Sequence, residues 1–306
     1  MRQTSASEAA QRRLDVIGLG ECMVEFHSTE ALAQAVTFHR AYGGDVLNAL
    51  VAAARQGART AFVSRVGDDP FGPALLAAWR AEGIDTSHAP LVPGENGVYF
   101  ISVDARGERS FTYRRAGSAA AGMTAELDES FIASSRCLLL SGITQAISPG
   151  ARAATLAAAG IARRHGVTVA YDPNFRPRLW AGIGDARAAC AELLPCVDIL
   201  LPSLPADADV LPGPAETLAP HVAVKLGEAG CRVWHEGTWT DIAPVAAPVV
   251  DTTGAGDCWN GTYLAALLQG AAPAAAAALA NGAAAAKLAH RGAIPPRLPA
   301  FTGAAA

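Results

Sequence analysis

Residues 251–257 (DTTGAGD) combine the groups that an anion site needs, and they precede an apolar stretch that predicts a helix over residues 255–268. Gly254 and Gly256 have no Cβ, so backbone N–H groups can approach an anion closely. These N–H groups also lie at the positive end of the helix dipole. Asp257 follows in the first helical turn, where a carboxylate can accept the proton of an attacking hydroxyl. The pattern therefore favours transfer of a phosphate-like group to an alcohol.

A purely structural interpretation of the same segment stays open, in which residues 251–253 only cap the helix. Two common nucleotide-binding patterns are absent from the sequence. No G-x-x-x-x-G-K-[ST] segment occurs, which excludes a P-loop enzyme. Gly18 and Gly20 begin like a dinucleotide fingerprint, but residues 21–23 (ECM) do not supply the third glycine. A dehydrogenase of the Rossmann type is therefore disfavoured.

Short apolar runs alternate with longer helical stretches, and this alternation sets where the anion site would lie. Strands are expected at residues 14–20, 61–66, 98–104, 109–114, 137–140, 167–171, 197–201, 222–226 and 232–235. Helices are expected at residues 47–57, 72–82, 151–165, 185–194, 255–268 and 273–290. The alternation predicts an α/β fold of three layers, with a mainly parallel central sheet flanked by helices. Ligands of such sheets bind beyond the carboxyl ends of the strands.

Two of the expected strands interrupt the rhythm, because residues 98–104 and 109–114 flank a turn at residues 105–108. The pattern predicts a β-hairpin. Such a hairpin does not fit easily into a parallel sheet, so we expect a small β-sheet lid formed from about residues 20–43 and 96–116. Val98, Phe100 and Phe111 would give the hairpin an apolar face. A second subunit could cover that face, so we expect a homodimer or a higher homo-oligomer.

The composition excludes several classes of protein. The chain has 306 residues, 51% of them hydrophobic, and its formal net charge is −4. This is enough apolar material for a large core, and the slight acidity argues against a nucleic-acid partner. Residues 1–13 form a polar tail without the apolar run of a signal peptide, and no membrane span is expected, so we expect a cytoplasmic protein. Residues 14–303 are expected to form a single domain.

Taken together, several motifs resemble the ribokinase-like (PfkB) sugar kinases over roughly residues 14–297. These are DTTGAGD at residues 251–257, GGDVLN at residues 43–48 and RVGDDPFG at residues 65–72. Within that family the similarity is greatest to kinases of 2-dehydro-3-deoxygluconate, a sugar acid. The matching stretches are GECMV at residues 20–24, GERSFTY at 107–113, LSGI at 140–143, DPNFRPRLW at 172–180 and RGAIP at 291–295.

The resemblance implies an ATP-dependent phosphorylation of 2-dehydro-3-deoxy-D-gluconate to its 6-phosphate, with Mg²⁺ as cofactor. It assigns Asp257 as the base, and the amides of Gly254, Ala255 and Gly256 as the anion hole. Substrate contacts fall on Gly44, Asp45, Asn48, Tyr99, Tyr113, Arg115, Arg176 and Asp257. Nucleotide contacts fall on Asp172, Asn174, Lys225, Gly227, Gly230, Gly254 and Gly256. A monovalent cation such as K⁺ would lie on Asp251 and Thr253.

One departure from the family pattern concerns the metal–phosphate region. Relatives usually carry Asn-x-x-Glu where this chain has SLPAD at residues 203–207. Asp207 or Asp209 could substitute through water. The alternatives are a ribokinase-like kinase for another sugar, such as fructose or another sugar acid, and a catalytically silent sensor on a kinase fold.

Overall fold

The computed structural model describes residues 13–103 and 109–297; the remainder of the expected tail, the expected turn at residues 105–108 and the C-terminal residues from 298 lie outside the described residues. Within the described part, the centre is a nine-stranded sheet. Its order is β15 (Thr238–Ile242), β14 (Cys231–His235), β13 (His221–Lys225), β12 (Ile199–Leu200), β11 (Thr168–Asp172), β10 (Ser135–Ser141), β1 (Leu14–Leu19), β4 (Thr60–Val63) and β6 (Ile84–Asp85). Neighbours are parallel from β13 to β6, and β14 and β15 are antiparallel.

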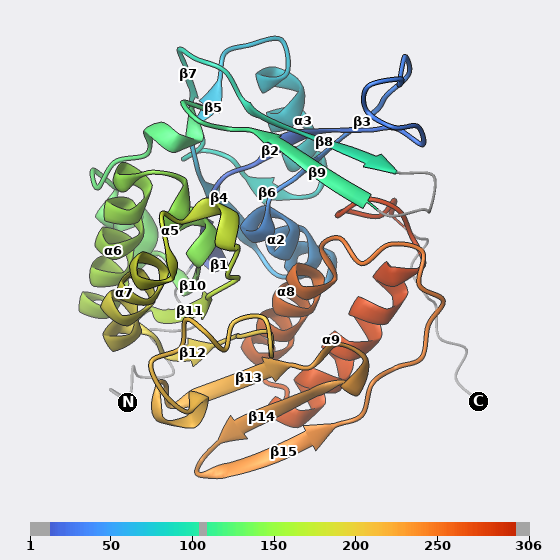
Figure 1. The fold of residues 1–306 in the computed structure, drawn as a ribbon. Helices are drawn as coiled ribbons and strands as arrows, with labels where there is room; N and C mark the ends of the chain where they lie inside the picture. Colours follow the sequence, from blue (N-terminus) through green and yellow to red (C-terminus); the bar gives the residue numbers. More distant parts are fainter. Residues whose placement is uncertain (1–12, 104–108, 298–306) are drawn as a thin grey trace.

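Helices cover both faces of this sheet (Figure 1). One layer contains α2 (Asp45–Arg55), α3 (Gly72–Ala81), α8 (Ala255–Leu268) and α9 (Pro273–Leu288). The other contains α4 (Glu129–Ala133), α5 (Gly142–Ile147), α6 (Pro149–Arg164) and α7 (Ile183–Leu193). The predicted three-layer α/β fold is confirmed.

The strands are apolar on both faces because both faces are covered. On β10, Cys137 and Leu139 pack with the α2–α8 layer, whereas Leu138 and Leu140 pack with the α6–α7 layer. This is the two-residue alternation of side chains along a strand. Helix α8 is buried on most of its surface, because it lies between α2 and α9. An all-round apolar helix is typical of such a position.

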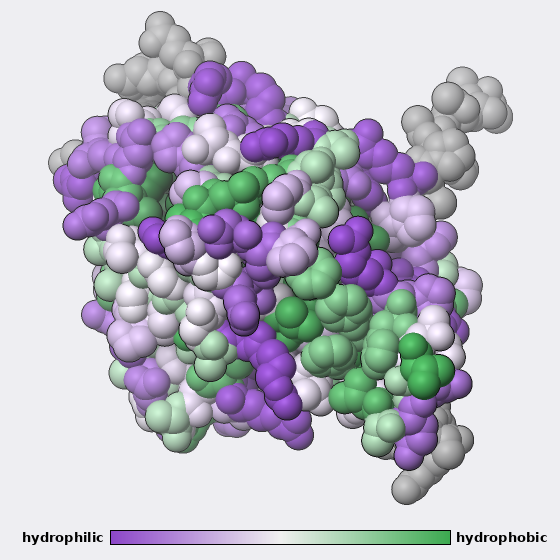
Figure 2. Space-filling model, turned by 90° about the horizontal axis from the view of Figure 1, so that it is seen from above, coloured by the Kyte–Doolittle hydropathy of each residue, from purple (hydrophilic) through white to green (hydrophobic). Residues whose placement is uncertain are grey.

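A second, four-stranded sheet lies above the central sheet in Figure 1, in the order β3 (His39–Gly43), β2 (Met23–His27), β8 (Gly97–Val103) and β9 (Arg109–Arg114). Strands β8 and β9 are antiparallel, as the expected hairpin requires. We call this sheet the small sheet. A further short pair joins β5 (Val66–Gly67) to β7 (Leu91–Val92). Seen from above, hydrophobic patches alternate with hydrophilic side chains on this side of the molecule (Figure 2).

The apolar residues of the hairpin are partly covered within the chain. Phe100 stacks with Phe26 at 5.8 Å between ring centroids and meets Phe38 edge-on at 6.0 Å. Val98 and Phe111 are half-buried against core residues. These contacts weaken the argument that a second subunit must cover the hairpin, and the homodimer stays a prediction.

Strand β15 was not predicted. It pairs with β14 across a tight turn at Glu236 and Gly237, which have φ values of 49° and 78°. Two successive positive φ values are the signature of a two-residue hairpin turn, so the Glu-Gly pair was a usable signal. No helix within residues 13–103 or 109–297 has the length and apolar character needed to span a membrane.

Candidate active site

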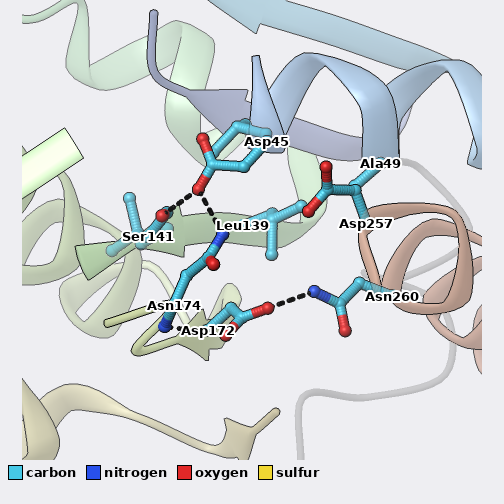
Figure 3. A pocket seen from close by; sticks show the side chains of 10 residues that line it. Asp45, Ala49, Leu139, Ser141, Asp172, Asn174, Asp257 and Asn260 are labelled. Atoms are coloured by element: carbon cyan, nitrogen blue, oxygen red, sulfur yellow. Dashed lines mark hydrogen bonds between the residues drawn. The ribbon is translucent and has the colours of Figure 1, made fainter. Parts of the chain in front are cut away.

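A polar pocket lies where the carboxyl ends of β10 and β11 meet the first turns of α2 and α8 (Figure 3). Its lining contains Asp45, Val46, Ala49, Leu139, Leu140, Ser141, Asp172, Asn174, Asp257 and Asn260. Helix α2 supplies one wall and α8 the opposite wall, while the floor comes from the two strand ends. This is the edge of a parallel sheet at which ligands bind.

Asp257 lies in the first turn of α8 and is held by α2. Asn48 Nδ2 donates a hydrogen bond of 2.8 Å to Asp257 Oδ2. Burial raises the pKa of Asp257, the negative charge of Asp45 raises it further, and the Asn48 bond acts in the opposite direction, so that the pKa is about 7. A carboxylate with a pKa near neutrality is suited to take up and release a proton at physiological pH.

Asp45 faces Asp257 across the pocket in Figure 3. The hydroxyl of Ser141 and the side-chain amide of Asn174 both donate to Asp45 Oδ2, the latter at 3.0 Å. Asn174 has a φ of 40°, in the left-handed region that asparagine tolerates better than most residues. Burial raises the pKa of Asp45 despite these bonds. Helix α2 therefore brings a second carboxylate and a ready hydrogen-bond acceptor to the pocket.

Asp172 and Lys225, both expected at the nucleotide, form a buried ion pair at the floor of the pocket. Lys225 Nζ lies 2.7 Å from Asp172 Oδ2 and also donates to the carbonyl of Leu201 at 2.7 Å. Asn260 Nδ2 donates to the same Asp172 oxygen at 2.6 Å and its Oδ1 accepts from Lys225 at 2.8 Å. The pair joins β11 and β13 to α8. A contact of either residue with a nucleotide stays a prediction.

The expected anion-hole loop begins α8 as predicted. Gly254 is the N-cap with a φ of 73°, and a Cβ there would lie 2.8 Å from the carbonyl oxygen of Ala293. No side chain caps the helix. At Gly256 a Cβ would come no closer than 4.0 Å to Lys225, so packing within the chain does not demand this glycine. Its missing side chain instead leaves space at the positive end of the helix.

Two glycines of the expected nucleotide loop, Gly227 and Gly230, differ in whether packing within the chain requires a glycine. Gly230 has a φ of 87°, and its Cβ would lie 2.4 Å from the carbonyl oxygen of Ile242, so the β14–β15 hairpin requires it. Gly227 has a φ of 60°, is exposed, and has nothing within 4 Å of a built Cβ.

Gly44, just before α2, is required because a Cβ there would lie 1.9 Å from the carbonyl oxygen of Glu21.

The small sheet presents the residues expected at the substrate. The guanidinium of Arg115, 12% exposed, forms an ion pair with the buried Glu21, which also accepts from Ser118 Oγ at 2.8 Å. Burial raises the pKa of Glu21, and the Arg115 charge opposes that rise. Arg115 is thus paired with a buried carboxylate, which the sequence did not indicate. Its contact with a substrate stays a prediction.

Tyr99 and Tyr113 stack at 5.8 Å between ring centroids, on neighbouring strands β8 and β9. Tyr99 is buried and its hydroxyl donates to Glu25, whereas Tyr113 is 43% exposed. Burial raises the pKa of Tyr113. Positive charges that act to lower it are those of Arg115, Arg176 and Arg178. The charges of these three arginines therefore act on Tyr113, and Arg176 and Arg178 are exposed.

Asp207 is bonded to the backbone on both of its carboxylate oxygens. It is fully buried, and its two oxygens accept from the backbone N–H groups of Phe175 at 2.8 Å and Ser203 at 2.6 Å. Asp207 therefore ties the loop after β11 to the loop after β12. Asp209 is exposed, and its carbonyl accepts from Arg187 Nε at 2.6 Å.

The segment expected to hold a monovalent cation is closely tied to the end of α9. Asp251 Oδ1 accepts from the N–H of Thr253 and Oδ2 from the N–H of Gly292, each at 2.8 Å. The carbonyl oxygen of Asp251 accepts from Lys287 Nζ at 2.7 Å. The three oxygens of Asp251 on which a metal cation was expected therefore already accept from N–H groups and an ammonium group.

Sequence reasoning missed three residues at or near the site. Ser141 lies in a segment that carried the resemblance, but nothing in its type marked it. Asn260 is three residues after Asp257 and so lies on the same face of α8, which was a usable signal. Lys287 was interpreted only as part of a helix.

Comparison with known proteins shows the family to which the chain belongs. Residues 13–300 match the pfkB family carbohydrate kinases. The chain is 36% identical over 304 residues to the 2-dehydro-3-deoxygluconokinase of Escherichia coli K12, covering 91% of this chain and 96% of that protein. A PfkB protein from Polaromonas sp. JS666 has a structure with a TM-score of 0.82 and 32% identity, covering 89% of this chain and 95% of that chain.

A third comparison concerns the nucleotide. A ribokinase II from E. coli, solved with ATP and Mg²⁺, superposes with a TM-score of 0.85 at 24% identity, covering 92% of this chain and 94% of that one. At this identity the likeness shows the shared fold. The chain belongs to the pfkB family of carbohydrate kinases, with the ribokinase-like fold. It is therefore a sugar kinase.

Proposed function

We propose that this chain transfers the γ-phosphoryl group of ATP to the terminal hydroxyl of 2-dehydro-3-deoxy-D-gluconate. The observation that carries the proposal is Asp257, which has a pKa of about 7 and lies in the first turn of α8, next to the backbone N–H groups of residues 254–256. No side chain caps these N–H groups, and that of Ala255 donates to the carbonyl of Thr252 at 3.2 Å. A proton acceptor and an anion hole thus adjoin one another. The 36% identity to a 2-dehydro-3-deoxygluconokinase supports the choice of substrate.

The proposed phosphoryl transfer takes place in a single step. The substrate hydroxyl oxygen forms a bond to the γ-phosphorus as the bond from that phosphorus to the β,γ-bridging oxygen breaks. Asp257 accepts the hydroxyl proton, and ADP leaves with the bridging oxygen. The backbone N–H groups of Gly254, Ala255 and Gly256 stabilise the negative charge on the transferring group. Mg²⁺, bound to the ATP phosphates and to water, would neutralise phosphate charge.

The polar groups of α2 would hold the sugar. Asp45 retains acceptor capacity beside the pocket, and the N–H of Gly44 and the side chain of Asn48 lie at the same helix start. Asn48 has a second role, because its amide donates to Asp257 and so orients the base. Asn174, which donates to Asp45, would fix this carboxylate in place.

The carboxylate of a sugar acid needs a cation, and the candidates come from the loop after β11 and from the end of the small sheet. Arg176 is exposed, and its NH1 group contacts only the neighbouring carbonyl of Phe175 among the bonds described, at 3.1 Å. Its remaining donors could bind a carboxylate in the two-pronged manner of guanidinium groups. We assign Arg176 as the main contact and Arg115 as a second one, with Tyr113 between them. The small sheet would act as a lid over the sugar.

The remaining assignments concern ATP. Gly227, which is exposed and unhindered at a positive φ, would let the loop after β13 approach the nucleotide closely. Gly230 would shape the same loop through the β14–β15 hairpin, and Lys225 and Asp172 would support the floor beneath the phosphates.

A substrate panel tests the proposal. ADP release is measured with 2-dehydro-3-deoxygluconate, its galactonate epimer, fructose and ribose at equal concentrations. The proposal requires the highest kcat/KM on one of the two sugar acids, and the gluconate form is the expected one. A higher kcat/KM on fructose or ribose would overturn the substrate assignment. ATP binding without turnover of any sugar would favour the silent sensor.

A further inference from the structure

The chain contains only two lysines, Lys225 and Lys287, against 22 arginines. Both lysines are buried, with 7% and 1% of their surface exposed. Arginine therefore provides nearly every positive charge of this protein, and lysine is kept for two interior positions. A compact ammonium group binds clustered oxygens as a point charge, which a planar guanidinium cannot do in the same space. Lys225 forms its ion pair with Asp172 at the pocket, whereas Lys287 lies at the end of α9.

Lys287 lies in the last turn of α9 and reaches back to the segment that precedes α8. Its Nζ donates to the carbonyl oxygens of Asp251 at 2.7 Å and His290 at 3.3 Å. Burying an ammonium group is costly unless such oxygens surround it. The ammonium therefore joins the segment before α8 to the segment after α9, in the manner of a small bound cation.

The surrounding bonds make this junction a single unit. The N–H groups of Val250 and Asp251 donate to the carbonyl of Leu288 at 2.8 and 3.1 Å. The Asp251 carboxylate accepts from Thr253 and from Gly292. Burial acts to raise the pKa of Asp251, but the two backbone N–H groups and the positive charge of Lys287 outweigh it and lower the pKa to about 2.

The anion-hole loop rests on this unit. Gly254 lies against Ala293, where a Cβ would come within 2.8 Å of the Ala293 carbonyl oxygen. The backbone that carries Ala293 follows Gly292, which is bonded to Asp251. A loss of the Lys287 charge would leave the Asp251 carbonyl without its ammonium donor and loosen the start of α8.

The monovalent metal cation that the family resemblance places on Asp251 and Thr253 does not fit these residues. The Asp251 carbonyl oxygen accepts from the Lys287 ammonium group at 2.7 Å. A metal ion bound to the same oxygen would lie close to this ammonium group, and the two positive charges would repel each other. The oxygens of the Asp251 carboxylate each accept an N–H bond. The cation position is thus filled by the chain's own side chain.

We propose that Lys287 is a built-in cation that holds the anion-hole loop of residues 251–256 in place, so that phosphoryl transfer by this chain needs no monovalent metal cation. Lys287 is a positioning residue, since it acts through the backbone of the loop. The inference concerns the kinase activity proposed above, and it also makes a statement about folding stability that can be tested without any sugar.

The experiment compares the wild type, Lys287→Met and Lys287→Ala in potassium chloride and in tetramethylammonium chloride of equal ionic strength. The wild type should show the same melting temperature and the same kcat in both salts. Lys287→Ala opens space for an ion, so its melting temperature should fall in tetramethylammonium and be partly restored by K⁺. Its kcat should fall by roughly tenfold, the equivalent of one lost charge-assisted hydrogen bond, and K⁺ should restore part of it.

Lys287→Met keeps most of the side-chain volume and loses the charge, so its kcat should fall with little rescue by K⁺. Arg291→Met is the matched control, because it removes an exposed positive charge from the same segment, and it should leave both readouts unchanged. Activation of the wild type by K⁺ of about tenfold or more would overturn the inference, a readout that stands even if the variants fail to fold. A Lys287→Met protein that matches the wild type would also overturn it.

If no sugar is phosphorylated, the proposed function fails, and the melting temperatures still decide the role of Lys287. A wild type whose melting temperature rises in K⁺ but not in tetramethylammonium would show a metal site and overturn the inference. Equal wild-type melting temperatures, together with a K⁺-dependent gain in Lys287→Ala, would support it.

Discussion

The pKa of the proposed base should control the acid side of the pH–rate profile, and two substitutions should move it in opposite directions. The pKa of Asp257 is about 7 because burial and the Asp45 charge raise it more than the Asn48 hydrogen bond lowers it. Catalysis needs the deprotonated form, so kcat/KM should rise with pH and level off above about 7. An ordinary aspartate would instead give a profile that is flat down to its usual pKa of 3.8.

Asn48→Ala removes the 2.8 Å bond to the ionised carboxylate. A hydrogen bond to a charged group contributes roughly 1.5 kcal/mol, and 1.36 kcal/mol corresponds to one pH unit. The midpoint of the acid side should therefore move up by about one pH unit. Asp45→Asn removes the neighbouring negative charge while keeping the side-chain shape, so the midpoint should move down by a similar amount, about one pH unit.

The assay is initial-rate ADP release at sugar concentrations well below KM, from pH 5 to 9 in a constant-ionic-strength buffer. The observable is the midpoint of the acid side in each variant, which is independent of any overall loss of rate. A wild-type profile that stays flat over this whole pH range, as expected for the ordinary pKa of 3.8, would contradict the assignment. Shifts of both variants in the same direction would refute it as well, because the two substitutions act on the Asp257 charge with opposite sign.

The pH dependence of the free energy of unfolding gives a second test of the Asp257 pKa. The direction of that dependence follows from the difference in bound protons between the folded and unfolded states. Asp257 binds its proton more tightly in the folded chain than at its ordinary pKa of 3.8. The folded state therefore holds more protons than the unfolded state between about pH 4 and pH 7, and the free energy of unfolding should fall as pH rises through that window. Asp257→Asn should flatten this part of the stability curve, measured by urea denaturation.

Three further predictions follow from packing, charge and assembly. Gly261→Ala should lower the free energy of unfolding by about 3 kcal/mol, because its Cβ would lie 1.9 Å from the Ala49 carbonyl oxygen. Its control, Gly282→Ala, has nothing within 4 Å and should raise that free energy by about 0.5–1 kcal/mol in urea denaturation. Arg176→Ala should raise KM for the sugar acid about tenfold or more and leave KM for fructose unchanged in the ADP-release assay; equal effects on both would remove its assigned role. Light scattering should give twice the 31.3 kDa mass of one chain, with Phe111→Ser lowering it, and a wild-type monomer at micromolar concentration would end the homodimer prediction.

Local sequence patterns were sufficient for the fold and for the two helix starts that carry the site. The glycines and acidic residue of DTTGAGD placed the start of α8, and the helix expected from residue 47 begins two residues earlier, at Asp45, as α2. Both signals lie within a few residues of the helix start. The alternation of strands and helices then fixed which edge of the sheet they share.

Partners distant in the sequence could not be predicted in the same way. Asn48 and Asp257 are 209 residues apart, and only the folded chain shows that the Asn48 amide orients the Asp257 carboxylate. The same holds for Glu21, which neutralises Arg115, and for Lys287, which reaches Asp251 from the end of another helix. The type of a residue indicates that it can bind a charged group, but only the tertiary structure shows which charged group lies next to it.

The measurement that tests the central claim most directly is the kcat of Asp257→Asn with 2-dehydro-3-deoxygluconate and ATP, beside the wild type and with folding confirmed by melting temperature. The substitution keeps the shape of the side chain and removes the proton acceptor. We predict a fall in kcat of about 10²–10⁴ in a folded protein. A folded Asp257→Asn protein whose kcat stays within about tenfold of the wild type would show that Asp257 is not the base.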